Sequence, residues 1–118
     1  MKIRSTYLDK TFSLYIRTRD NFTCQHCGKS GGLMDCAHIY SRRHVGTRWD
    51  PLNAVCLCRG CHMRFTVEIH DWVAWVNTIR TSAELQLIQA RARTVTKFTA
   101  KDREALNRDL RSKLKAMS

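Results

Sequence analysis

Apolar residues recur at helical spacing near the start of the chain. The stripe, spaced i, i+4, i+7 and i+8, consists of Leu8, Phe12, Tyr15 and Ile16. Such a stripe predicts an amphipathic helix whose apolar face packs on a core. Thr6, followed three residues later by Asp9, has the pattern that caps the first turn of a helix. We therefore expect a helix that begins just after Thr6 and reaches Arg19.

The second half of the chain has the same periodicity and predicts further helices. One apolar face consists of Ile69, Trp72, Val73, Val76 and Ile79. Thr81 and Glu84 have capping-box spacing, which predicts a helix that continues to Arg93. A last helix is expected after Thr99, which Asp102 complements in the same way. Its narrow apolar seam consists of Leu106, Leu110 and Leu114. This seam can pack on the rest of the chain, which is the simpler expectation, or against a second copy.

Between these helical regions the pattern changes to short extended segments. Residues 33–40 and 53–58 have the length and apolar character of strands, and residues 41–50 form a polar loop that carries arginines. A further helix is expected from near Arg59, and it carries His62. The predicted fold class is α+β: a small core of two strands and a helix, preceded by one helix and followed by a helical extension.

Length and hydropathy limit the classes of protein to which the chain can belong. Its 118 residues suit one domain, or one compact core with an extension. No stretch approaches the ~20 apolar residues that span a bilayer. The segment from Met1 to Thr6 lacks the apolar core of a signal peptide. We therefore expect a cytoplasmic protein without a membrane partner.

The charge of the chain indicates the kind of partner. Lys and Arg outnumber Asp and Glu by 21 to 10, which gives a net charge of +11. Such a protein attracts polyanions, and DNA is the expected partner. A basic surface that only faces solvent, or an acidic protein partner, is the alternative.

Four of the six cysteines are spaced as metal ligands rather than as disulfides. Cys24 and Cys27 form one Cys-x-x-Cys pair, and Cys58 and Cys61 form another. In a reducing compartment, two such pairs predict four thiolates around a structural Zn²⁺ ion. The remaining two are expected to be small buried side chains; they are Cys36 and Cys56. Use of Cys56 in place of Cys58 is a looser alternative.

Between and beside these pairs lie residues that resemble a known family. Ala37-His38-Ile39, then Asn53, then Cys58-x-x-Cys61-His62 are similar to the HNH motif of zinc-stapled ββα-metal nucleases. The resemblance covers about half the chain, roughly residues 12–65. It divides the chain into an HNH nuclease core with its N-terminal helix at residues 1–67 and a helical extension at residues 68–118, for packing, DNA contact or dimerisation.

The resemblance implies two short strands and a helix around one divalent ion. His38 would act as the general base, His62 would bind the catalytic Mg²⁺ or Mn²⁺, and Asn53 would hold the loop between the strands so that His38 keeps its orientation. The chemistry suits these side chains, because a neutral imidazole accepts a proton from water near neutral pH. A divalent ion stabilises the phosphate and the departing 3′ oxygen, which leaves 5′-phosphate and 3′-hydroxyl ends.

One position departs from the family pattern. Many HNH domains carry an Asp or His directly before the general base as another metal ligand, and here that residue is Ala37. Asp35, His44 or Glu68 can compensate, or His62 can act with water and phosphate alone. The departure puts the metal-binding set in doubt but leaves the base in place.

Five arginines near the motif predict how DNA is held. They are Arg42, Arg43, Arg48, Arg59 and Arg64. Arginine forks grip phosphate oxygens without reading bases, so we expect a structure-dependent enzyme. The segments 38–42 and 48–50 resemble phage recombination endonucleases of the NinG/Rap kind, which implies branched DNA as substrate. Two other interpretations stay open: a non-catalytic zinc-stabilised nucleic-acid-binding module, and a zinc-stapled domain whose C-terminal helices bind a protein.

Overall fold

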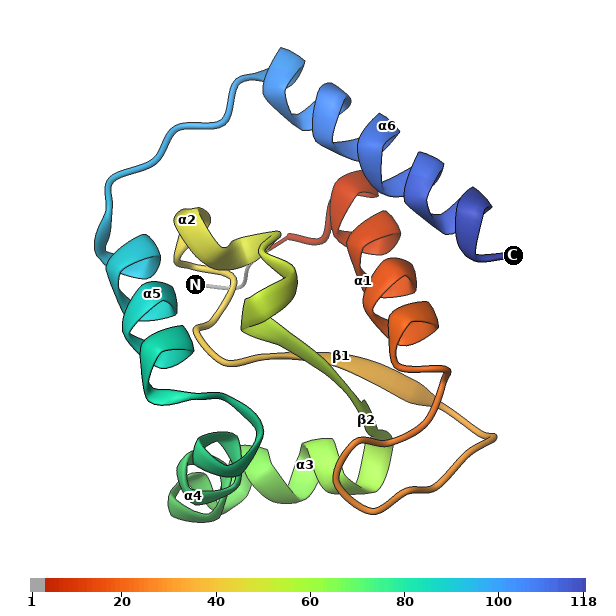
Figure 1. Cartoon of the computed structure of the whole chain (residues 1–118), viewed down its shortest axis with the longest axis vertical. Coiled ribbons are helices and arrows are strands. Elements are labelled where there is room, and N and C mark those ends of the chain that lie inside the picture. The colour runs from red at the N-terminus through yellow and green to blue at the C-terminus, as the bar shows by residue number, and fades with distance from the viewer. Residues whose placement is uncertain (1–3) are drawn as a thin grey trace.

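The computed structural model describes residues 4–118 and shows a mostly helical α+β fold (Figure 1). Its elements in chain order are α1 (Tyr7–Arg19), β1 (Met34–His38), α2 (Val45–Arg48), the 3₁₀ turn η1 (Pro51–Asn53), β2 (Ala54–Cys58), α3 (Arg59–Val67), α4 (Ile69–Ile79), α5 (Ser82–Arg93) and α6 (Ala100–Met117). Residues 1–3, part of the segment without a signal-peptide core, lie outside the described residues. No helix of the described chain is both long enough and apolar enough to cross a bilayer.

Capping boxes start three of the helices, as their sequence spacing predicts. In each box the threonine side chain accepts from the backbone three residues on, and the acidic side chain there accepts from the threonine backbone N–H. These bonds satisfy backbone groups that have no partner inside the helix. The three pairs are Thr6–Asp9, Thr81–Glu84 and Thr99–Asp102.

The two strands pair antiparallel, with Cys36 opposite Cys56 and His38 opposite Ala54. Both strands lie inside the segments predicted to be extended, but Asn53 belongs to η1 rather than to the strand. Pro51 favours this turn because its ring fixes the backbone angle of a first helical position. The loop at residues 41–50 also contains the single turn α2, which has no capping side chain of its own.

The helical extension packs back onto the rest of the chain at several places. α6 lies beside α1, where Leu110 is buried with Phe12 and Ile16, so the apolar seam is used within the chain (Figure 1). α5 packs on α2 at Gly46, where a methyl group would collide with the backbone carbonyl of Arg91. The extension therefore covers the N-terminal helix and supports the loop between the strands.

Candidate metal centre and active-site groove

Four cysteines meet where β1 begins and β2 ends. Cys24 and Cys27 lie in the loop after α1, Cys58 ends β2, and Cys61 lies in the first turn of α3. Their sulfur atoms all lie within 4.8 Å of one another, and no second cluster of this kind occurs among residues 4–118. The predicted pairing is therefore confirmed, and the alternative that uses Cys56 is wrong.

The geometry of the cluster fits a tetrahedral metal ion. The sulfurs of Cys27 and Cys58 are 3.8 Å apart, and metal–sulfur bonds of about 2.3 Å give a tetrahedral edge of about that length. In each pair the backbone N–H of the second cysteine donates to the sulfur of the first, at 3.5 Å for Cys24 and 3.4 Å for Cys58. Because these bonds stabilise thiolates, the cluster is compatible with structural zinc.

The electrostatics of the cluster also favour a cation. Burial opposes ionisation of Cys24, but backbone N–H groups, led by that of Cys27, outweigh it and lower the pKa to about 7. Burial and the neighbouring sulfur of Cys58 raise the pKa of Cys61. Cys24 therefore ionises easily, whereas ionisation of Cys61 beside it is opposed. A divalent ion at the centre supplies the positive charge that lets all four ionise.

His26 lies between the first two cysteines and covers one side of this cluster. Its Nδ1 lies 3.3 Å from the sulfur of Cys61. Its ring packs edge-on against Phe65 and Trp75, with centroids 4.8 and 5.3 Å away. Because a metal-bound thiolate accepts hydrogen bonds, His26 is placed to donate one and to shield this side from water.

The other two cysteines face each other across the sheet and take no part in the cluster. Burial raises the pKa of Cys36 to about 12 and that of Cys56 to about 11. Both thiols therefore stay protonated at neutral pH. Cys56 is buried as the sequence predicts, whereas Cys36 is only partly buried.

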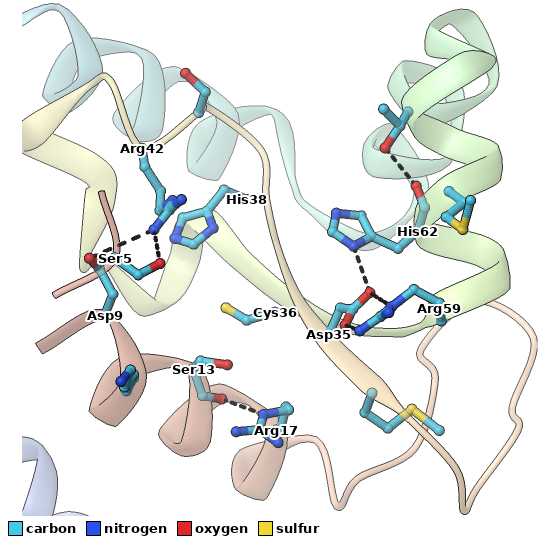
Figure 2. Close-up of a pocket in the computed structure, with 15 residues that line it drawn as sticks. Ser5, Asp9, Ser13, Arg17, Asp35, Cys36, His38, Arg42, Arg59 and His62 are labelled. Atoms are coloured by element: carbon cyan, nitrogen blue, oxygen red, sulfur yellow. Dashed lines mark hydrogen bonds and ion pairs between the residues drawn. The ribbon is translucent and has the colours of Figure 1, made fainter. Parts of the chain in front are cut away.

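A groove of about 870 Å³ is lined by α1, β1 and α3 (Figure 2). β1 contributes Asp35 and His38, and α3 contributes Arg59 and His62. The two histidines of the HNH-like pattern therefore open onto one cavity, although they come from different elements.

His38 ends β1, and its Nε2 lies 3.0 Å from the backbone carbonyl oxygen of Arg48. Because a carbonyl only accepts, Nε2 carries the proton and Nδ1 keeps the lone pair. Burial lowers the pKa of His38, and the positive charge of Arg42 adds to this, against the opposing effect of the Arg48 carbonyl. The ring is thus held neutral near pH 7, as a general base requires.

His62 is held in the opposite tautomer. Its Nδ1 lies 3.0 Å from a carboxylate oxygen of Asp35, so Nδ1 carries the proton and Nε2 keeps the lone pair. Arg59 donates to both oxygens of the same carboxylate, at 2.9 and 3.0 Å. Burial opposes ionisation of Asp35, but the hydrogen bonds from Arg59 and His62 outweigh it and lower its pKa.

Asp35 accepts three hydrogen bonds, and the one from His62 orients that ring. Its role as the replacement metal ligand stays a prediction. The other two candidates lie elsewhere: His44 packs edge-on against Tyr40, and Glu68 accepts from Arg64. Ala37, the position that departs from the family, is buried in the core.

Asn53 is fully buried and ties the end of β1 to the loop that follows. Its side-chain oxygen accepts from the backbone of Tyr40 at 2.8 Å, and its amide donates to the carbonyls of Tyr40 and Thr47 at 3.0 and 3.1 Å. The geometry agrees with the prediction that Asn53 holds this loop. Its burial also keeps it away from any ion in the groove.

Three of the arginines predicted to contact DNA have accessible side chains near the loop or the groove. Arg42 lines the groove and donates to Ser5 at 2.8 Å. Arg59 lines it from the other side while bonded to Asp35. Arg43 is exposed but is not among the residues that line the groove.

The other two arginines have structural partners. Arg48 makes an ion pair of 2.6 Å with Asp9, and its side chain is only 13% exposed. The ion pair competes with the phosphate contact predicted for Arg48, because its guanidinium is already bound inside the fold. Arg64 pairs with Glu68 and Asp71 on the side of α3 that faces α4. Its charge is therefore balanced outside the groove.

α1 supplies a basic wall that the sequence did not reveal. Lys10, Ser13 and Arg17 line the groove at spacing i, i+3 and i+7. Neither Lys10 nor Arg17 pairs with an acidic group among the described residues. The spacing of these polar residues was the available signal, but every solvated helix face shows the same pattern.

Comparison of the chain with protein-family models, with curated proteins and with solved structures finds no significant match. The likeness to HNH domains therefore depends on the residues and contacts described above.

Proposed function

We propose that this protein is a metal-dependent DNA endonuclease of the HNH type. The observation that carries the proposal is the presence of His38 and His62 in one groove, each with one ring nitrogen bonded to a fixed acceptor. Each ring therefore keeps a lone pair on its other nitrogen. A general base and a metal-binding imidazole both need such a nitrogen.

His38 acts on the attacking water. Its Nδ1 takes a proton from a water molecule as the water oxygen bonds to the phosphorus of the scissile phosphodiester. The backbone carbonyl of Arg48 accepts from Nε2 throughout, so it also stabilises the ring when it becomes positive. The lowered pKa of His38 keeps the base unprotonated before each turnover at neutral pH.

His62 is the residue that would hold the catalytic ion. Mg²⁺ or Mn²⁺, when bound, polarises the phosphate and stabilises the departing 3′ oxygen, which leaves 5′-phosphate and 3′-hydroxyl ends. The available nitrogen is Nε2 because Nδ1 donates to Asp35. A carboxylate behind a metal-binding histidine commonly sets its tautomer in this way. Asp35 and Arg59 thus orient His62, and water and phosphate would complete the set of ligands to which Ala37 cannot contribute.

The cysteine cluster holds a structural zinc ion in this proposal. Cys58 ends β2 and Cys61 lies in the first turn of α3. Zinc binding to both fixes the direction in which α3 leaves the sheet. His62 directly follows Cys61, so the ion also fixes the position of His62 in the groove.

The DNA backbone lies along the groove. Its cationic side chains are Lys10, Arg17, Arg42 and Arg59. They position phosphates without reading bases, which suits a structure-dependent enzyme. The phage recombination resemblance points to branched DNA, with a Holliday junction as the first substrate to test. A dimer through the seam of α6 has no support among the described residues, because α1 buries Leu110.

The test is cleavage of supercoiled plasmid and of a synthetic four-way junction in Mg²⁺ and in Mn²⁺. Wild type should cut, and His38→Ala should cut at least about 100-fold more slowly while binding DNA equally well. His70→Ala is the matched control, because His70 is exposed on α4 and is not among the residues lining the groove. It should cut as wild type does.

If both substrates stay intact after incubation of wild type with each metal, the proposal of a nuclease is refuted. Retained binding that weakens with salt would then favour the non-catalytic nucleic-acid-binding module. Absence of both cutting and binding would favour the protein-interaction domain.

A further inference from the structure

Asp9 lies in the first turn of α1, outside the HNH-like motif, yet it reaches the loop between the strands. Its carboxylate accepts from Arg48 through Nε at 2.9 Å and Nη2 at 2.6 Å. It also accepts from the indole N–H of Trp49 at 2.9 Å. Only 8% of the Asp9 side chain is exposed. Asp9 therefore joins α1 to the end of α2.

Helix capping does not account for these contacts. Glu84 and Asp102 occupy the same place in the other two capping boxes. Their hydrogen bonds are only to the threonine of their own box among the described residues. Burial opposes ionisation of Asp9, but the hydrogen bonds from Arg48 and Thr6, together with the charge of Arg48, outweigh it and the pKa falls to about 2. The carboxylate is thus charged and bound to α2 at every pH near neutral.

The residue that Asp9 holds is also the residue that orients His38. The backbone carbonyl of Arg48 accepts from His38 Nε2. This carbonyl belongs to α2, a helix of four residues. A helix of one turn has no stability of its own, so side chains from elsewhere must fix its position. Asn53 holds it at Thr47, and Asp9 holds it at Arg48.

We propose that Asp9 is a positioning residue for His38: it fixes the Arg48 carbonyl, and that carbonyl fixes the imidazole. The catalytic part of this inference rests on the proposed role of His38 as the base. The hydrogen-bond chain is independent of that role. It runs from α1 through the end of α2 to the end of β1, and it includes neither a cysteine of the cluster nor His62.

The experiment compares Asp9→Asn with Asp102→Asn. Both variants weaken a capping box, but only Asp9→Asn places an amide N–H₂ against the donors of Arg48. The first readout is the Nε2–H proton of His38 in the NMR spectrum, which its bond to the carbonyl protects from exchange with water. Asp9→Asn should speed this exchange at least about tenfold, and Asp102→Asn should leave it unchanged.

The second readout is steady-state cleavage of the junction. Asp9→Asn should lower kcat about tenfold, because a displaced base slows the chemical step. Arg42 of the groove also lies 3.7 Å from the Asp9 carboxylate, so an unchanged KM is expected only of Arg48→Ala. Arg48→Ala should have the same effect on kcat, and it leaves the Thr6–Asp9 capping box intact. Arg48→Ala carries the test alone if Asp9→Asn does not fold.

The two proposals fail separately. If the His38 proton is equally protected in wild type and in the two aspartate variants, the positioning role is wrong whether or not the protein cuts DNA. If the His38 proton loses its protection from exchange only in Asp9→Asn and Arg48→Ala, the positioning role stands. If wild type also cuts nothing, the nuclease proposal is wrong.

Discussion

The cysteine cluster and the groove both bring distant residues to one point, but they do so by different means. The cluster uses four identical side chains in two turns, and each turn orients its own sulfurs through the adjacent backbone. The groove takes His38 and His62 from different elements, and each ring depends on a partner elsewhere in the chain. All four positions of a metal ion are filled in the first case, which favours stability. One nitrogen of each ring stays open in the second, which favours chemistry.

If the cluster holds zinc as proposed, removal of that ion should have the largest effect. Binding of structural zinc contributes on the order of 10 kcal/mol, as much as the whole stability of a typical domain. A strong chelator, or Cys61→Ala, should therefore abolish cooperative unfolding and reduce the helical signal in circular dichroism. Cys36→Ala is the control, because Cys36 lies outside the cluster, and it should keep one zinc per chain. Full helicity of zinc-free protein would contradict the role of the ion.

Replacement of Asn53 should have the next largest effect on stability, and it should leave the cysteine cluster intact. Asn53→Ala leaves the backbone of Tyr40 and the carbonyl of Thr47 without their buried partner. We expect a loss of about 3 kcal/mol in urea unfolding, with zinc content unchanged. Asn77→Ala, at an exposed position on α4, should cost far less. Equal losses in the two variants would mean that Asn53 does not support the groove.

Loss of Lys10 should change binding and leave stability alone. If Lys10 contacts one phosphate, Lys10→Ala should reduce the slope of log affinity against log salt by about 1. The measurement is DNA binding without divalent metal over a range of salt. Lys101→Ala, at an exposed lysine of α6, has the same charge change away from the groove and should keep the wild-type slope. An unchanged slope in Lys10→Ala would remove α1 from the DNA interface.

The pH dependence should show the smallest effect. Burial lowers the pKa of His38 below its usual 6.5. If the neutral ring is the base, kcat/KM should rise with pH through this lowered pKa and stay level above it. At pH 6.5 wild type should then retain more than half of its maximal kcat/KM. The same shift makes the unfolded state bind more protons below about pH 6.5, so stability falls there as pH falls. A midpoint above pH 6.5 would contradict the buried base.

The predictable parts of this molecule are those whose signals lie close together in the sequence. The partners of each capping box are three positions apart, as are the cysteines of each pair, so both are visible before any tertiary contact is known. The strands follow from short apolar runs. α2 was not predictable, because a single turn in a polar loop is held by side chains from other elements and has no periodicity of its own.

The groove was only partly predictable, because its supports come from distant positions. The bond between Arg48 and Asp9 joins residues 39 apart, and an arginine in a polar loop has the same sequence pattern whether it binds a carboxylate or faces water. The sequence indicates Asp35 as a candidate ligand, but it does not show that Arg59 and His62 bond to its carboxylate. Residue types therefore predict the chemistry, whereas the partners of each atom decide the role.

The contact between α1 and α6 has a consequence for the order in which the protein matures. Tyr7 and Arg111, which are hydrogen bonded, are 104 positions apart. A ribosome makes α1 first of these elements and α6 last, so α1 lacks the partner for its apolar face until nearly all the elements have been synthesised. Because α1 also carries Asp9 and the basic wall, the packing that holds these side chains in place is completed only after the strands and α3 have been made.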